Sequence, residues 1–91
     1  MTRRLRILAS AAEEAIEAAA FYEAEHQGLG AEFDSALNAV PGRAGRRGAK
    51  RFVLRRFPYD IVVLEHPDEL LVVAIAHQRR RPGYWRRRLG G

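Results

Sequence analysis

Arginine dominates the residues of this chain that could bind or transform a ligand. Of the 16 Lys and Arg residues, only Lys50 is a lysine. Arg presents a planar fork of donors that suits phosphate or carboxylate, whereas Lys is a point charge. The candidates lie between Arg51 and Arg88, on and after a run of strand-like segments: Arg51, Arg55, Arg56, His77, Arg79, Arg80, Arg81, Tyr84 and Trp85.

A polyanion would find paired guanidinium groups in this segment, an imidazole with an ordinary pKa of about 6.5, and two rings for stacking. We therefore predict that these residues bind a partner and that the partner is acidic. Tyr84 and Trp85 have a second interpretation, in which they pin the C-terminal tail to the sheet. A lone Trp in a small domain is usually part of the core, and we favour that interpretation for Trp85.

Charge is segregated along the chain. From Ile7 to Val40 there are seven acidic residues and no Lys or Arg, whereas Pro41 to Gly91 holds thirteen basic and four acidic ones. A genome rich in G and C would favour Arg codons, but it would not separate the charges in this way. Like charges this dense repel each other unless something acidic neutralises them, so we predict a binding function for the Arg cluster.

Other kinds of site find little support. His26, His66 and His77 stand alone, without a second ligand three or four positions away, so no metal site is predicted. There is no cysteine and hence no thiolate site. The segment from Gly42 to Gly45 lacks the spacing of a phosphate-binding loop. We expect no cofactor.

The first half of the chain predicts a strand and a helix. Residues 4–9 alternate loosely, as in a strand. Ser10 and Glu13 have the spacing of a capping box, which predicts a helix from Ser10 to about Gln27. Glutamates, Glu14 among them, are expected on its solvent-exposed surface. Small residues at helical spacing predict the inward stripe: Ala12, Ile16, Ala19 and Tyr22 or Glu23.

A second helix is predicted from near Ala31 to Pro41, where Pro and Gly stop it. Its apolar face has helical spacing: Phe33, Ala36, Leu37 and Val40. The connection between the two helices is short, so residues 10–40 are expected to form an antiparallel hairpin.

The second half predicts a basic loop, a strand region and a basic tail: residues 42–50, 51–77 and 78–91. The strands within that region are expected at 51–57, 59–65 and 70–77. The last is apolar almost throughout and should be central, with both faces covered. We predict a single α+β domain over residues 1–91, in the order β-α-α-β-β-β. A helical hairpin should cover one face of a small, mainly antiparallel sheet.

No run is apolar and long enough for a membrane helix, since the longest, Leu70 to Ala76, is far short of about 20 residues. No signal peptide is visible at the start. We expect a soluble, cytoplasmic protein without a membrane partner.

Four segments resemble the RelE/ParE superfamily, the toxins of type II toxin–antitoxin systems. They are residues 11–23 (AAEEAIEAAAFYE), 28–33 (GLGAEF), 55–59 (RRFPY) and 77–85 (HQRRRPGYW). Each is weak alone, but their order and spacing extend over most of the chain. The resemblance implies the β-α-α-β-β-β fold. It also implies a cognate antitoxin, whose acidic C-terminal segment folds onto the toxin in a hetero-oligomer.

The superfamily divides by mechanism. RelE-like members are ribosome-dependent mRNA endoribonucleases, and the matching candidates here are Arg51, Arg79, and His77 or Tyr84. However, this chain has Asp60 after the aromatic residue of the middle strand, where those nucleases place an arginine.

On the preceding strand, Val53 stands where those nucleases place a second cation. The set is incomplete, so we favour the ParE-like members, which are similar in inhibiting DNA gyrase and are associated with plasmid stabilisation. A RelE-like nuclease and a non-toxic binding module of the same fold remain alternatives. Relatives also carry a second helix longer by about two or three turns of 3.6 residues.

Overall fold

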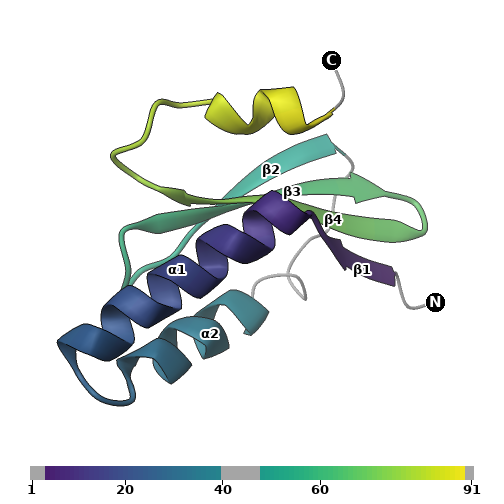
Figure 1. Ribbon diagram of the computed structural model, residues 1–91. Coiled ribbons are helices and arrows are strands. Elements are labelled where there is room, and N and C mark those ends of the chain that lie inside the picture. Colours follow the sequence, from purple (N-terminus) through teal and green to yellow (C-terminus); the bar gives the residue numbers. More distant parts are fainter. Residues whose placement is uncertain (1–3, 40–47, 90–91) are drawn as a thin grey trace.

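The computed structural model describes residues 4–39 and 48–89. Within them the chain forms the predicted α+β order, ending in a short 3-10 helix labelled η2 (Figure 1). The elements are β1 (Arg4–Ile7), α1 (Ala9–Glu25), α2 (Leu29–Ala39), β2 (Gly48–Val53), β3 (Tyr59–His66), β4 (Glu69–His77) and η2 (Tyr84–Leu89). Val40, Pro41 and residues 42–47 of the predicted basic loop lie outside the described residues.

The four strands form one sheet in the order β1-β4-β3-β2. β1 pairs with β4 in parallel, and the other two pairs are antiparallel, so the sheet is mainly antiparallel as predicted. β4 is central and its residues from Leu70 to Ala76 are all buried, which confirms the prediction for that strand. Both of its faces are covered, by the helices on one side and by Tyr84 and Trp85 on the other, which explains why its sequence is apolar throughout.

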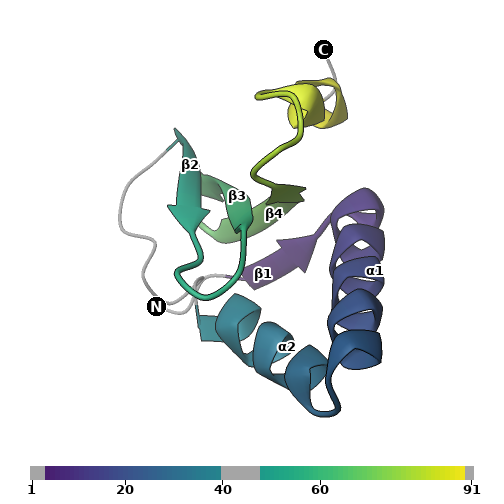
Figure 2. The same ribbon diagram turned by 90° about the vertical axis from the view of Figure 1, so that its left-hand side faces the viewer.

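The α-helical hairpin and η2 lie on opposite sides of the sheet (Figures 1 and 2). Side chains alternate between the two sides, as the strand period requires. Ile61, Val63 and Val72 join the core beneath the helices, whereas Val62 and Leu71 join a smaller cluster that Tyr84 and Trp85 cover. Trp85 thus has the packing role favoured from the sequence.

The inward stripe predicted for α1 is confirmed for Ala19 and Tyr22, which pack against the core, but the buried alanines lie one position before the predicted ones. Ala11 and Ala18 are buried, whereas Ile16 is 69% exposed. In a helix that is rich in alanine all round, spacing does not determine which alanines face inward. On α2 the prediction is confirmed for Phe33, which is fully buried.

The predicted capping box at Ser10 is wrong. Helix α1 begins at Ala9, and its N-cap is Leu8, which makes no side-chain cap hydrogen bond. Leu8 still belongs to the end of the first strand, since its amide donates to the carbonyl of Val72 at 3.0 Å. The chain therefore enters the helix directly from β1, before Ser10 can occupy a cap position.

The boundaries of β2 also differ from the prediction. The strand begins at Gly48, inside the predicted basic loop, and ends at Val53. Residues 54–58 form a turn, closed by the Leu54 amide donating to the carbonyl of Tyr59 at 3.0 Å. Phe57 anchors this turn beneath the helices, with its ring centroid 4.9 Å from that of Tyr22. The predicted strand 51–57 would have held Arg51, Arg55 and Arg56 together. That prediction is wrong, because Arg55 and Arg56 lie in the turn and only Arg51 lies on β2.

The predicted C-terminal tail is folded in its described part. After β4 the chain turns at Gly83, whose φ of +78° favours glycine, and enters η2. Within residues 4–39 and 48–89, no helix is long and apolar enough to cross a membrane.

Candidate functional site

A partly buried carboxylate joins helix α1 to the C-terminal segment. Both oxygens of Glu14 accept from Arg88, with Nη1 to Oε1 at 2.8 Å and Nη2 to Oε2 at 2.9 Å. The hydroxyl of Tyr84 donates to Oε2 at 2.6 Å, and Arg80 reaches the same oxygen at 3.3 Å. The side chains of Glu14 and Arg88 are only 14% and 19% exposed. We call these four residues, Glu14, Arg80, Tyr84 and Arg88, the Glu14 cluster.

This cluster also completes the edge of β4. Strand β1 pairs with β4 only as far as Val72, because the chain then enters α1. Beyond that point the amide of Ile75 donates to Glu14 Oε1 at 3.0 Å, and the carbonyl of Val73 accepts from Arg88 at 3.1 Å. Two side chains thus satisfy backbone groups that a longer β1 would have paired.

Protonation in the cluster is fixed by these contacts. Burial alone would raise the pKa of Glu14, but hydrogen bonds from Arg88, Tyr84 and the Ile75 amide outweigh it, and the pKa lies below its usual value. Burial and the hydrogen bond to Glu14 raise the pKa of Tyr84 to about 12. Tyr84 therefore stays protonated, as a hydrogen-bond donor, to a higher pH than an ordinary tyrosine.

Arg51 is neutralised within the sheet. Its Nε donates to Oδ2 of Asp60, whose other oxygen accepts from Gln78 at 3.1 Å. Asp60 is 1% exposed, whereas the Arg51 side chain is 58% exposed. In the sequence, Asp60 argued against a nuclease and Arg51 argued for one. In the structure these two residues are direct partners.

A small cavity of about 120 Å³ lies between the end of β4 and η2. Three of the four predicted catalytic candidates line it, namely Arg51, His77 and Tyr84, but Arg79 does not. The Nδ1 atom of His77 accepts a hydrogen bond from the Arg79 amide at 3.1 Å. We call this 120 Å³ cavity the Arg cavity. Its lining residues are Arg51, Val62, Ala76, His77, Arg80, Arg81, Pro82, Gly83, Tyr84, Trp85 and Arg86.

The predicted partner-binding residues are not all in one place. Arg51, Arg80, Arg81, Tyr84 and Trp85 surround the Arg cavity, whereas Arg55, Arg56 and Arg79 do not. Arg56 instead pairs with Glu32 of α2 at 2.8 Å. Among the described residues, six arginines have no carboxylate partner: Arg4, Arg55, Arg79, Arg81, Arg86 and Arg87.

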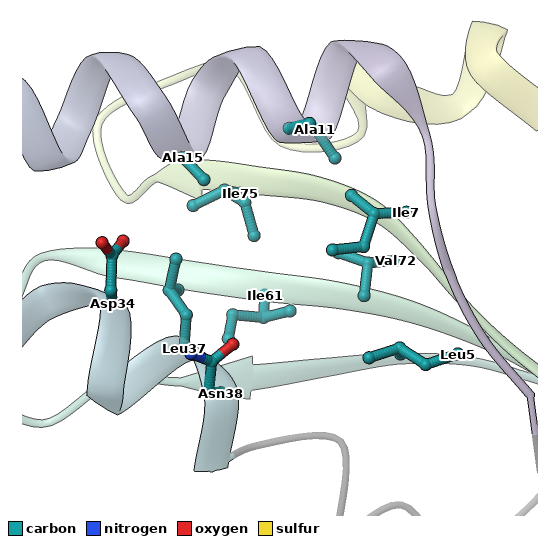
Figure 3. Close-up of a pocket in the computed structure, with 11 residues that line it drawn as sticks. Leu5, Ile7, Ala11, Ala15, Asp34, Leu37, Asn38, Ile61, Val72 and Ile75 are labelled. Carbon is teal, nitrogen blue, oxygen red and sulfur yellow. The ribbon is translucent and has the colours of Figure 1, made fainter.

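A second, apolar cavity of about 240 Å³ opens between β1, the two helices and the sheet. In Figure 3, Ala11 and Ala15 of α1 and Leu37 of α2 face Ile61 and Ile75 of the sheet across it. Leu5 and Ile7 of β1 complete the wall and are about half exposed, at 50% and 51%. β1 is the outer strand, so its far edge pairs with no strand in the described part of the chain.

Sequence reasoning missed Glu14 and Arg88. Glu14 was expected on the exposed surface of its helix, and Arg88 was one of several arginines in the tail. They are 74 positions apart, so no local spacing connects them. The described segments also hold no group of three or more His, Asp or Glu residues placed to bind a metal ion.

Comparisons with known proteins show a shared fold. The chain matches no protein-family model and no curated protein. It is similar in structure to a chain of the chromosomal ParDE TA system from P. aeruginosa, with a TM-score of 0.66 and 14% sequence identity. The match covers 82% of this chain and 95% of that one. At this identity the likeness establishes the fold expected from the sequence and nothing finer.

Proposed function

We propose that this protein is the toxin of a bacterial type II toxin–antitoxin system, of the ParE-like kind. The observation that carries the proposal is the fold, which it shares over 82% of its length with a chain of a ParDE TA system. The sequence segments that resemble the RelE/ParE superfamily point the same way. In this proposal the protein acts in the cytoplasm, binds its cognate antitoxin and inhibits an essential enzyme, DNA gyrase.

The state of the candidate catalytic groups favours binding over RNA cleavage. Cleavage of a phosphodiester needs free cations for the transition state and groups that can exchange protons. Arg51 is already paired with Asp60, and Tyr84 donates to Glu14 with a pKa of about 12. Arg79 lies outside the cavity that the other candidates line.

The surface suits an antitoxin segment that is acidic and partly apolar. Charge complementarity comes from four arginines of residues 79–87 that pair with no described carboxylate: Arg79, Arg81, Arg86 and Arg87. The apolar cavity beside β1 offers burial for side chains of the same segment. A disordered segment loses entropy when it folds on a partner, and burial and charge pairing together offset that loss.

Growth arrest tests the toxin assignment. Expression of the protein alone should prevent colony formation, and co-expression of the short open reading frame beside its gene should restore it. A chain that is harmless at high expression would instead be a non-toxic binding module of this fold. The same purified toxin should stall supercoiling by gyrase in a plasmid assay, and unaffected gyrase at saturating toxin would remove the proposed target.

A RelE-like, ribosome-dependent mRNA endoribonuclease is the second candidate, favoured by one observation. Arg51, His77 and Tyr84 line the same cavity, next to further arginines. Translating ribosomes incubated with such a nuclease would yield messenger cut at the A site, and Arg51→Ala would abolish cutting. Intact messenger would leave the ParE-like proposal as the one to pursue.

A further inference from the structure

We propose that the Arg cavity binds the carboxylate of a single Asp or Glu side chain from an acidic partner polypeptide. This inference rests on the proposed function, in which that polypeptide is the antitoxin, and it adds the place and chemistry of one contact. The argument uses the charge of the cavity, its size and walls, and a carboxylate already bound next to it.

Two cations of the cavity have no acidic partner among the described residues. Arg51 is paired with Asp60 and Arg80 with Glu14, but Arg81 and Arg86 pair with no carboxylate of the described residues. The turn at Gly83 brings Arg86 back over the cavity, since a β-carbon on Gly83 would lie 3.0 Å from Nε of Arg86. Two guanidinium groups at so small a cavity repel each other, and a bound anion relieves that repulsion.

The size of the cavity limits what the anion can be. About 120 Å³ is well below the roughly 300 Å³ at which sites for small molecules and cofactors begin. The walls also include apolar groups, from Val62, Ala76, Pro82 and Trp85. A charged head on a short methylene stem matches such a lining, whereas a nucleotide is too large to enter.

The neighbouring Glu14 cluster shows how this segment holds a carboxylate. There, two arginines and a tyrosine hydroxyl from residues 80–88 surround Glu14 of α1. The same segment carries Arg81 and Arg86 at the cavity, without a described acid. Asp60, bound to Arg51, adds negative charge nearby, which disfavours a phosphate dianion more than a carboxylate.

Binding of a synthetic peptide tests the proposal. The probe is a short fluorescein-labelled peptide of alternating Glu and Ala, with a Gln-for-Glu version as the uncharged reference. Binding to the full chain is followed by anisotropy at about 0.15 M salt, where exposed charges are largely screened beyond about 8 Å. Trp85, the only Trp of the chain, lines the cavity, so its fluorescence should change on binding of the unlabelled Glu peptide.

The double variant Arg81→Gln/Arg86→Gln should weaken binding of the Glu peptide by about tenfold or more, since charge-assisted hydrogen bonds are lost. The matched control is Arg4→Gln/Arg6→Gln, which removes the same charge from exposed positions of β1 that do not line the cavity. It should weaken binding by less than about threefold, as expected for exposed charges. Thermal unfolding of each variant checks that the fold is intact.

Equal loss in both double variants would overturn the proposal, because it would mean that the peptide responds only to net charge. Tighter binding of a single-stranded oligonucleotide, with the same dependence on Arg81 and Arg86, would assign the cavity to phosphate instead. A negative result in the peptide-binding experiment would not contradict the toxin assignment, because growth arrest and its rescue test that assignment separately. Absence of growth arrest together with cavity-dependent peptide binding would remove the toxin assignment and keep the carboxylate site.

Discussion

At the scale of single residues, Glu14 has more structural partners than its sequence context indicates. It accepts hydrogen bonds from Arg80, Tyr84, Arg88 and the Ile75 amide. One side chain thereby links α1, β4 and η2. A partly buried carboxylate in such a position favours its charged form, since each of these neighbours donates to it.

Replacing Glu14 should therefore destabilise the fold. We expect Glu14→Gln to lower the free energy of unfolding by about 2 kcal/mol, because Arg88 and Tyr84 lose a charged acceptor in a partly buried place. The control is Glu13→Gln, an exposed neighbour on the same helix, with an expected change within about 0.5 kcal/mol. Urea unfolding measures both, and equal values would contradict the role given to Glu14.

The residue types at the candidate site could be predicted from the sequence, but their pairing could not. Five of the residues predicted to bind a partner surround the Arg cavity. Asp60 was singled out because it stands where a nuclease would place a cation, and its pairing with Arg51, made where β2 lies beside β3, was not predicted. Glu14 and Arg88 are 74 positions apart, so no sequence period predicts their contact.

At the scale of elements, the edge of β4 explains why α1 and η2 lie where they do. β1 is short, and the backbone of β4 beyond Val72 must find other partners. Glu14 and Arg88 supply them. β4 also carries an extra residue relative to β3, since Val63 pairs with Val72 and Val62 with Ala74. The skipped residue, Val73, is the one whose carbonyl accepts from Arg88.

The close contact of α1 with α2 gives a prediction at this scale. A β-carbon on Gly30 would lie 2.7 Å from the backbone oxygen of Ala19, so the two helices would have to move apart. We expect Gly30→Ala to cost about 2 kcal/mol, in the range of overpacked cores. Ala31→Ser, on the exposed side of α2, should change stability by less than about 0.5 kcal/mol. Chemical denaturation compares them, and a tolerated Gly30→Ala would mean that the hairpin is loosely packed.

Element order and the central place of β4 could be predicted because long apolar runs and strong breakers mark them. The exact inward face of α1 could not, because alanine is found on every side of that helix. Residues 54–57, in the turn at residues 54–58, were predicted as strand, since Leu54 and Phe57 are apolar. They are buried there as anchors of a turn, which an apolar pattern alone cannot distinguish from a strand.

At the scale of the whole molecule, the acidic first half and basic second half of the chain meet in the folded state. Glu14 pairs with Arg80 and Arg88, and Glu32 pairs with Arg56. The acid of the first half is thus used partly to bind the second half. The arginines that remain without a described partner are concentrated in residues 79–87, next to the Arg cavity. The net charge of +5 is counted over the whole chain. The positive charge that is available to a partner is instead concentrated in this one segment.

The dependence of stability on pH should report this internal pairing from both ends of the scale. The pKa of Glu14 in the folded state lies below its ordinary value of 4.5. Its contribution to stability is therefore fully present above that value and is lost as the pH falls through the lower, folded-state pKa. Tyr84 behaves in the opposite sense, because folding raises its pKa from 10.0 to about 12. Its contribution is fully present below pH 10 and is lost as the pH rises towards about 12.

Urea unfolding across pH, with Glu14→Gln and Tyr84→Phe beside the unmodified protein, separates the two effects. The stability difference between the unmodified protein and Glu14→Gln should be constant near neutral pH and shrink in the acid range, as protonation removes the charge that the substitution also removes. The difference for Tyr84→Phe should stay constant up to about pH 10 and shrink above it. A difference for Glu14→Gln that persists unchanged through the acid range would show that Arg88 and Tyr84 do not hold an ionised carboxylate. Packing and uncharged hydrogen bonds, and not ion pairing, would then join the two halves of the chain at Glu14.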